Sequence, residues 1–409
     1  MNKRKIVNDP VYGFINIPNS IVYDLIEHPY FQRLRRIKQL GLTNLVYPGA
    51  FHTRFQHALG AMHLTTLAIE VLRQKGHVIS DEEAEAALIA ILLHDIGHGP
   101  YSHALEYCII PGISHEELSL AIMNELNTVF NGRLSLAIDL FQGKYHKKFL
   151  HQLVSGQLDM DRLDYLRRDS FFTGVSEGVV SSDRIIKMLE VVDDELVVEA
   201  KGIYSIEKFL IARRLMYWQV YLHKTVLASE LMLTKCIGRA RQLVQSGIHA
   251  DCSEPLSYFL ILKHFEISPE MLAHFTKTDD YDVMYALKKW TDHDDFLLQY
   301  LSSGIIDRHL FKVKLEKEPF SSDYIEKLRK QAAKHFNIGI NEASHLVFTD
   351  AVSNNAYSFA DEKINILVQG RLVDVTEASD MLNHSVMSKT VRKHILCFPT
   401  EIQHVINQP

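Results

Sequence analysis

Residues 94–103 read HDIGHGPYSH and directly follow an apolar run, AALIAILL, at positions 86–93. Such a run, preceded by the serine and glutamate of a capping box, predicts a buried helix that ends at this motif. The inward stripe of the helix continues onto His94 and Asp95, so an imidazole and a carboxylate should point into the protein together. A buried carboxylate without a partner is costly, and a bound cation relieves that cost. The plain alternative is a satisfied core histidine beside a capping aspartate.

Length and composition predict a helical protein with two parts. The chain has 409 residues, of which 47% are hydrophobic and 23% charged, as in soluble globular proteins. Because this length exceeds one compact core, we expect a large helical domain over 1–310 and a small α+β module over 311–409. Glycine (19) and proline (11) are sparse, which favours long helices over a turn-rich β fold.

Charge and cysteine usage exclude several classes of protein. The net charge of −6 provides no basic field for nucleic acid, so a nucleic-acid partner is not expected. The four cysteines form no CxxC pair, which argues against a disulfide framework or a thiolate zinc site. The first residues contain no apolar leader segment, and no apolar run is long enough to cross a membrane. We therefore expect a cytoplasmic protein that does not bind membranes.

Two further stretches place polar side chains on inward helical faces. His57, in HTRFQHALG at 52–60, shares a helical face with the apolar residues that follow it. The stretch LDMDRLDYLRRDS at 158–170 predicts a helix with Asp161, Asp164, Tyr165, Arg168 and Asp169 on one side. A surface ladder of salt bridges is the alternative interpretation of that helix. The density of opposite charges instead suits a pocket that binds a cation and a phosphate together.

The remaining elements are predicted from periodicity and turn residues. FQRLRRIKQLG at 31–41 has an apolar stripe and four basic residues, which form either a solvated face or an anion site. A hairpin is expected from strands 195–199 and 203–206 across Lys201–Gly202, followed by one long helix over about 206–245. In the C-terminal module we expect strands at 311–315, 345–352 and 364–375, and a helix over about 323–335.

The order of the inward-facing residues suggests one metal site. His57, then His94 and Asp95, then Asp161 give a mixed nitrogen and oxygen donor set with open coordination positions. Such a set suits one divalent ion, and the ligand types alone do not choose among Zn²⁺, Fe²⁺, Mn²⁺, Mg²⁺ and Ni²⁺. A metal ion with an open position lowers the pKa of bound water and polarises a phosphoryl oxygen.

Five longer blocks in this order resemble a known family: NDPVYG (8–13), FQRLRRIKQLG (31–41), HTRFQHALG (52–60), LLHDIGHGPYSH (92–103) and DMDRLDYLRRDS (159–170). They resemble the His-Asp (HD) phosphohydrolase superfamily, in the deoxynucleoside triphosphate (dNTP) triphosphohydrolase branch. That branch includes the vertebrate sterile-alpha-motif HD protein and bacterial relatives. The resemblance spans about residues 5–245 and implies a mainly α HD-domain helical bundle, with its HD core at about 50–170, a short β-hairpin and the C-terminal α+β module.

The resemblance also implies a reaction and a set of residues. Water attacks the α-phosphorus of a dNTP, and deoxynucleoside and tripolyphosphate leave. The implied metal ligands are His57, His94, Asp95 and Asp161, and a second ion can enter with the substrate phosphates. The implied catalytic residues are His98, His115 as proton donor, Arg54 on the phosphate, and Glu106, which stands where some relatives carry aspartate. The implied substrate-binding residues are Gln39, Leu40, His103, Arg162, Tyr165, Asp169, Arg213 and Tyr221.

Regulation and assembly are the last implications of the resemblance. Several relatives bind nucleotide activators between subunits, which promotes a tetramer. The matching positions are Lys5, Asn8, Glu27 (an aspartate elsewhere) and Arg35, and we expect a homo-oligomer, either dimer or tetramer. Alternatives stay open: a nucleotidase or phosphatase, a phosphodiesterase for another nucleotide, a nucleotide-sensing module with weak catalysis, or a di-iron oxygenase on the same scaffold.

Overall fold

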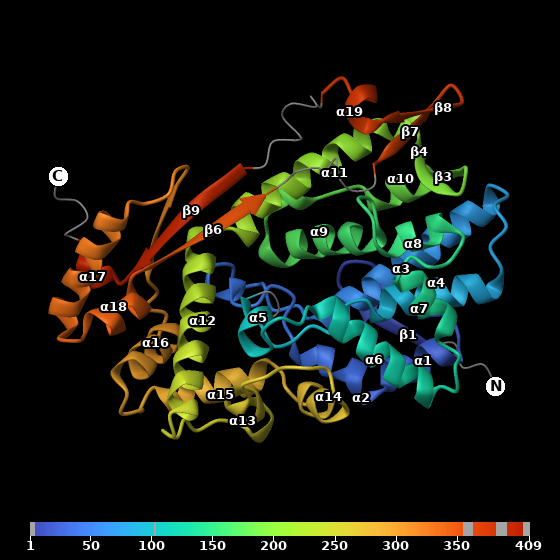
Figure 1. Ribbon diagram of the computed structural model, residues 1–409. Coiled ribbons are helices and arrows are strands. Elements are labelled where there is room, and N and C mark those ends of the chain that lie inside the picture. The colour runs from blue at the N-terminus through green and yellow to red at the C-terminus, as the bar shows by residue number, and fades with distance from the viewer. Residues whose placement is uncertain (1–4, 102–103, 355–362, 382–390, 404–409) are drawn as a thin grey trace.

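The computed structural model describes residues 5–101, 104–354, 363–381 and 391–403, and it is mainly helical (Figure 1). The helices of the first half are α1 (Ser20–Glu27), α2 (Pro29–Gln32), α3 (Arg54–Gln74), α4 (Asp81–Leu93), α5 (Glu106–Ile109), α6 (His115–Val129), α7 (Ser135–Phe141), α8 (Lys148–Val154), α9 (Met160–Thr173) and α10 (Ser182–Lys187). Those of the second half are α11 (Ile203–Met216), α12 (Lys224–Gln245), α13 (Glu254–Ile261), α14 (Pro269–Phe275), α15 (Asp280–Trp290), α16 (Phe296–Ile306), α17 (Ser322–Phe336), α18 (Ile340–Leu346) and α19 (Val375–Ala378).

The strands are short and belong to three sheets. They are β1 (Lys5–Asp9), β2 (Gly13–Ile17), β3 (Leu189–Val192), β4 (Glu195–Glu199), β5 (Lys312–Glu316), β6 (Phe348–Asn354), β7 (Asn365–Val368), β8 (Arg371–Asp374) and β9 (Val391–Phe398). The sheet orders are β1-β2, β3-β4-β7-β8 and β5-β9-β6. The fold class is therefore as predicted, a helical bundle with small β elements.

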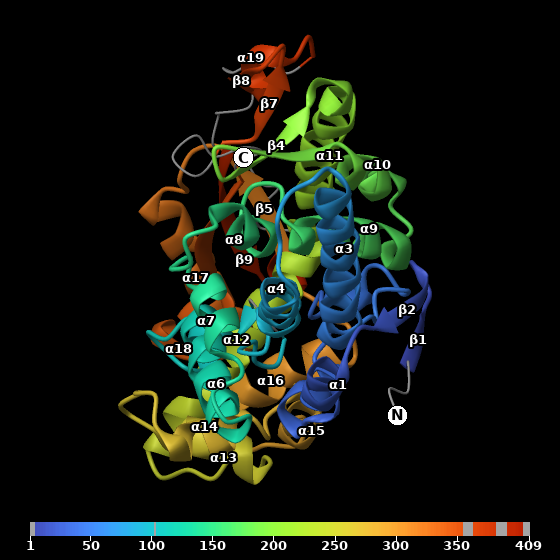
Figure 2. The same cartoon turned by 90° about the vertical axis from the view of Figure 1, so that its right-hand side faces the viewer.

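The centre of the bundle is α3, which packs against both α4 and α9. Helix α4 is buried along most of its length, and it begins with the predicted capping box, in which Ser80 and Glu83 exchange hydrogen bonds. The N-terminal hairpin β1-β2 lies beside α3 (Figure 2). Three segments far apart in the sequence thus meet around one helix, and this arrangement brings their polar residues together.

The C-terminal residues contribute to two different sheets. Strands β5, β9 and β6 form one sheet, in which β6 and β9 run from the region of α17 and α18 past the upper end of α12 toward α11 (Figure 1). Strands β7 and β8 instead join β3 and β4, because β7 pairs in parallel with β4. The predicted boundary at residue 310 stays a prediction. The strands beyond residue 310 contact the larger helical part at two places, where β7 pairs with β4 and where β5 packs on α12.

The position predicted for the hairpin is wrong. Its strands are β3 and β4, and the residues between them, Asp193 and Asp194, have φ values of +50° and +66°. Two residues with positive φ form the turn that suits the twist of a tight hairpin, although aspartate is a weaker signal for it than glycine. Residues 203–206, expected as the second strand, are the first turn of α11. A short apolar segment fits either kind of element.

The helix predicted over 206–245 is interrupted. A π-helical segment, Tyr217–Tyr221, follows α11, and α12 begins after His223, whose Nδ1 accepts a hydrogen bond from the Thr225 amide. The strand predicted at 345–352 begins only at Phe348, after α18, and the strand predicted at 364–375 is the pair β7 and β8. Helix 323–335 and strand 311–315 are confirmed as α17 and β5. Within the described ranges, no helix combines the length and apolar character needed to cross a membrane.

Candidate active site and metal centre

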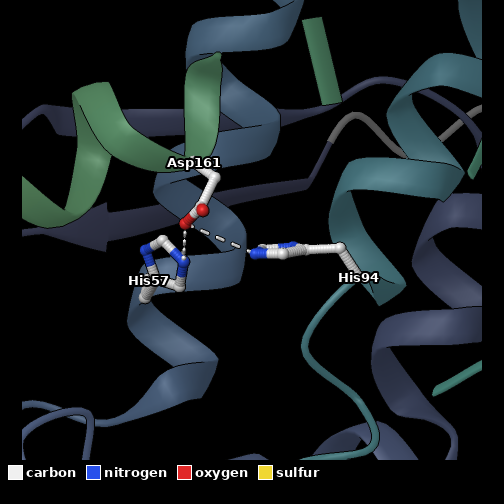
Figure 3. A group of neighbouring side chains, drawn as sticks. All are labelled: His57, His94 and Asp161. Atoms are coloured by element: carbon white, nitrogen blue, oxygen red, sulfur yellow. Dashed lines mark ion pairs between the residues drawn. The ribbon is translucent and has the colours of Figure 1, made fainter. Parts of the chain in front are cut away.

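Three helices deliver the predicted metal ligands to one point. His57 lies in α3, His94 directly follows α4, and Asp161 lies in the first turn of α9. Figure 3 shows both imidazoles turned toward the Asp161 carboxylate. Asp161 Oδ1 lies 3.0 Å from His57 Nε2 and 3.5 Å from His94 Nε2. The fourth predicted ligand, Asp95, has Oδ1 3.4 Å from His94 Nε2 and Oδ2 3.6 Å from His57 Nε2.

The two imidazoles are oriented by their other nitrogen atoms. His57 Nδ1 lies 2.8 Å from Asp164 Oδ2, and His94 Nδ1 lies 2.6 Å from the Ile91 carbonyl oxygen. With Nδ1 donating in both, the two Nε2 atoms face the centre, where neither makes a hydrogen bond within the described part of the chain. This is the arrangement of metal-binding histidines, whose second nitrogen is held by a carboxylate or carbonyl oxygen.

The charges of the site also favour a cation. Burial lowers the pKa of the His57 imidazole, but Asp161 and Asp164 outweigh it and raise this pKa to about 10. Burial raises the pKa of the Asp161 carboxyl, but the two histidines outweigh it and hold this pKa well below its usual range. The carboxylates therefore stay ionised and attract positive charge, which either protons on the imidazoles or a metal ion can supply. Two imidazoles and two carboxylates fit a divalent ion of the kinds predicted.

A buried chain of ion pairs supports His57 from behind. Asp164, at the His57 Nδ1 atom, accepts hydrogen bonds from Arg168 Nε at 2.9 Å and Nη2 at 3.0 Å. Arg168 Nη1 donates to Asp9 Oδ2 at 2.7 Å. Gly60 makes this contact between α3 and α9 feasible, because a Cβ at this position would lie 2.0 Å from Asp164 Oδ1. The chain connects the end of β1 with the metal centre.

A pair of histidines lies beside the metal centre. His98 Nδ1 is 3.2 Å from Asp95 Oδ1, and the ring centroids of His98 and His115 are 3.9 Å apart. Glu106 Oε1 lies 2.5 Å from His115 Nδ1 and also accepts a hydrogen bond from the His115 amide at 3.0 Å. Burial, together with the Arg54 charge, holds the pKa of His98 well below its usual range, so His98 is neutral. Arg54 itself contacts Asp95 Oδ2.

One cavity of about 580 Å³ joins the histidine pair to other predicted residues. It is lined by two predicted metal ligands, Asp95 and Asp161, and by most of the predicted catalytic and substrate-binding side chains: Gln39, Leu40, Arg54, His98, His115, Tyr165, Asp169 and Tyr221. The π-helical segment contributes Tyr217 and Tyr221 to its wall. The sequence blocks thus meet around a single enclosed volume, of the size that small-molecule sites have.

Asp169 is held in this cavity by two neighbours. Tyr221 donates its hydroxyl hydrogen to Asp169 Oδ2 at 2.7 Å, and His52 Nε2 lies 2.7 Å from Asp169 Oδ1. Burial, and then the Asp169 charge, raises the pKa of the Tyr221 hydroxyl well above its usual range, so this donor keeps its proton. The carboxylate of Asp169 is thereby fixed and keeps further lone pairs for a substrate hydroxyl.

Other predicted residues lie outside this cavity. Arg162 contacts the Gly156 carbonyl and the Asp159 carboxylate, and Arg213 Nη1 donates to Gln157 Oε1 at 3.2 Å. Glu106 lies behind His115 and does not line the cavity. His103 lies outside the described residues.

The four residues expected at an activator site lie in β1, at the end of α1 and in the turn after α2. Lys5 Nζ lies 3.5 Å from the Tyr23 ring centroid, and Arg35 covers the Phe55 ring at 3.5 Å. Asn8 lies in β1, and Glu27, the last residue of α1, is close enough to raise the pKa of Arg35, which partial burial lowers overall. None of the four lines the main cavity.

Several functional candidates escaped the sequence analysis. His52 stands inside the HTRFQH block, where its role was hidden by the more prominent His57. Tyr217 and Glu230 also line the cavity. The only signal for Glu230 was its position as a single acid within the apolar stretch VLASELML at 226–233.

Comparisons with known proteins agree with this geometry. The profile of the HD domain family matches residues 54–169, and that of the HD associated region matches residues 180–251. The chain is 31% identical to the uncharacterized protein YwfO of Bacillus subtilis, over 98% of this chain and 94% of that relative. It is 33% identical to the deoxynucleoside triphosphate triphosphohydrolase SAMHD1 homolog of Dictyostelium discoideum, over 59% of this chain and 50% of that relative.

A solved structure supports the same assignment. The crystal structure of a phosphohydrolase from Bacteroides thetaiotaomicron superposes with a TM-score of 0.94 at 54% identity, over 97% of this chain and 100% of the other. The matched HD region begins at Arg54 and ends at Asp169, so it contains all four metal-site residues. The chain belongs to the HD-domain phosphohydrolase superfamily.

Proposed function

We propose that this metal-dependent phosphohydrolase is a dNTP triphosphohydrolase, which releases deoxynucleoside and tripolyphosphate. One observation carries the proposal. A single cavity is lined at one place by side chains that can bind phosphate, Arg54 and the histidine pair. It is lined at another by an aspartate and a tyrosine that can hydrogen-bond a sugar hydroxyl. A nucleotide that reaches from one set to the other has its phosphate chain beside the metal centre. The names of the SAMHD1-type relatives support this choice of substrate.

The metal ion would be held by His57, His94, Asp95 and Asp161. When bound, such an ion polarises a phosphoryl oxygen and makes water a better nucleophile. A second ion that enters with the substrate phosphates is part of the proposal.

The protein's own groups would position the phosphate and supply a proton. The Arg54 guanidinium, which Asp95 anchors, binds phosphoryl oxygens through charge-assisted hydrogen bonds. Attack of water forms a P–O bond at the α-phosphorus, and the bond to the 5′-oxygen of the deoxynucleoside breaks. The proton that the attacking water loses replaces the one that His115 gives to the leaving oxygen. His115 Nε2 donates the proton that this oxygen takes up, because Glu106 occupies Nδ1 and stabilises the imidazolium. Neutral His98 keeps the neighbouring ring in place.

The sugar would be recognised in the middle of the cavity. Asp169, fixed by Tyr221 and His52, accepts a hydrogen bond from the 3′-hydroxyl, and Tyr165 packs on the sugar ring. Gln39 and Leu40 approach the 2′ carbon and sense the missing 2′-hydroxyl. In the same proposal, Arg162 and Arg213 turn from their present partners to the outer phosphates, and His103 assists the catalytic pair.

Activation and assembly remain proposals as well. A nucleotide activator would bind near Lys5, Asn8, Glu27 and Arg35, in a homo-oligomer of two or four subunits. This idea is supported by the buried chain that runs from Asp9, the neighbour of Asn8, to the metal ligand His57. An activator held by β1 would act on the metal centre along that chain.

The test is ³¹P NMR of the products after incubation with Mn²⁺ or Mg²⁺ and each dNTP, with and without GTP. Tripolyphosphate as the initial product supports the proposal, and a rate that depends on GTP supports the activator site. Orthophosphate or pyrophosphate as the first product would contradict it and indicate a nucleotidase or phosphatase at the same metal site.

A further inference from the structure

One carboxyl group that lines the cavity lacks the arginine, histidine or tyrosine partners that the carboxylates near the metal centre have. The Glu230 side chain, from α12, lines the cavity, and its carboxyl group makes no hydrogen bond or ion pair within the described part of the chain. Asp95 has Arg54, Asp161 has two histidines, and Asp169 has Tyr221 and His52. Removing a polar group from water without giving it a protein partner costs free energy, so this partly buried carboxyl group is a candidate for contact with a ligand.

Glu230 belongs to a stretch of lining that the cavity shares with a second cavity. The shared residues are Ala104, Leu227, Glu230 and Val352, here called the end wall, and the second cavity has a volume of about 590 Å³. The end wall is therefore apolar except for one carboxyl group. Val352 comes from β6, so the C-terminal strands help to close this end.

The surroundings of Glu230 favour its neutral form. A Cβ atom on Gly41 would lie 3.5 Å from Glu230 Oε1 and equally far from the Tyr101 carbonyl oxygen, so the space in front of the carboxyl group is narrow. Burial raises the pKa of this carboxyl to about 8. Near pH 7 it therefore carries a proton and offers one donor and one acceptor.

The proposed function identifies which part of the substrate would lie against the end wall. With the α-phosphorus at the metal centre and the sugar at Asp169 and Tyr221, the remaining part of the nucleotide is the base. Apolar and aromatic walls, here Leu227, Val352 and Tyr101, suit the faces of a flat ring. Each natural base carries a donor beside an acceptor on its pairing edge, which complements a neutral carboxyl group.

We propose that Glu230 is a specificity-determining residue that hydrogen-bonds the pairing edge of the substrate's nucleobase. This inference rests on the proposed function, because the phosphate and sugar sites fix the direction in which the nucleotide lies. It predicts a site that accepts any of the four natural bases and discriminates against a flat base without a hydrogen-bonding edge.

The experiment compares kcat/KM for dATP and dGTP with kcat/KM for a dNTP whose base is unsubstituted benzimidazole. In the unaltered protein we expect a preference of about 10- to 100-fold for the natural bases, the range for one or two hydrogen bonds in an enclosed site. Glu230→Ala should reduce this preference to below about threefold. Glu230→Gln should preserve it, because an amide also offers one donor and one acceptor.

Asp350→Ala provides the matched control. Asp350 is an exposed carboxylate of β6 that lines the second cavity but not the first, so its loss should leave the preference unchanged. A preference that survives in Glu230→Ala would overturn the inference while dNTP hydrolysis stands. Absence of hydrolysis of every dNTP by the unaltered protein would instead overturn the proposed function. Circular dichroism of each variant tests whether it is folded.

Discussion

The two ends of the cavity differ in how their charges are satisfied. At the metal end, Asp95, Asp161 and Asp164 each contact an arginine or a histidine, and buried ion pairs continue to Asp9. At the other end, Glu230 stands among apolar side chains with no partner in the described residues. The first arrangement holds groups in position before substrate arrives. The second arrangement leaves the Glu230 carboxyl group available to form hydrogen bonds with a bound ligand.

The largest expected effect comes from the metal ligands. His57→Ala and Asp161→Ala should each remove bound metal and lower kcat/KM by more than about 10³-fold, as loss of a central catalytic group does. Metal content by mass spectrometry and the rate of dNTP hydrolysis are the measurements. His63→Ala, a change in the same helix α3, should keep the metal. An active, metal-loaded His57→Ala variant would refute the ligand assignment.

The proton donor should have the next largest effect. His115→Ala should lower kcat by about 10²–10⁴-fold while metal content stays unchanged, because general acid catalysis contributes in this range. Glu106→Gln should cost less, since the imidazole stays but its positive charge is less stabilised. The control is His146→Ala, at an exposed histidine. Equal loss of metal and rate in His115→Ala would assign this residue to the metal site instead.

The buried ion pairs behind His57 should have a moderate effect. Asp9→Asn removes the charge that holds Arg168, and partners of this kind change metal affinity by about 10- to 100-fold. Titration of the metal-free protein with Mn²⁺ measures the change. Asp183→Asn is the matched control, because Asp183 pairs with Arg167 of the same helix at 3.8 Å on the surface. Identical metal affinities for the two variants would show that the buried chain does not support the site.

The smallest effect concerns the pH dependence of stability. Glu230 has a pKa raised to about 8, so between the unfolded value near 4.5 and pH 8 the folded protein binds more protons than the unfolded chain. Its stability should therefore fall as pH rises through this window. Glu230→Gln does not titrate at this position, so its free energy of unfolding relative to that of the unaltered protein should rise from pH 5 to pH 8. Urea unfolding at both pH values measures this difference. If the free energies of unfolding of the two proteins changed equally between pH 5 and pH 8, the Glu230 carboxyl group would be in contact with water.

The same contrast explains what could be predicted from the sequence. His57, His94 and Asp161 each belong to a local motif within or directly after a helix, so helical periodicity alone predicts that their side chains point inward. The end wall is built from Ala104, Leu227, Glu230 and Val352, which belong to distant segments. No local pattern joins those residues, since their proximity depends on how β6 and α12 pack. A single glutamate in an apolar helix gives too little signal by itself.

The errors in secondary structure have a similar origin. The hairpin was placed wrongly because Lys201–Gly202 is a familiar turn signal, whereas Asp193–Asp194 adopts the required positive φ without glycine. The break between α11 and α12 was missed because the residues around it continue a helical pattern. That break directs Tyr217 and Tyr221 into the cavity, so the deviation from regular structure falls at the candidate site.

Hydrolysis of a dNTP in H₂¹⁸O tests the central claim most directly. Attack on the α-phosphorus predicts one ¹⁸O atom in tripolyphosphate, on a terminal phosphorus, and none in the deoxynucleoside, as read by mass spectrometry and the ³¹P isotope shift. Label in the 5′-hydroxyl of the deoxynucleoside would mean attack at carbon. Label in orthophosphate with a deoxynucleoside diphosphate as the other product would mean terminal hydrolysis. Either result would contradict the proposed roles of Arg54 and His115.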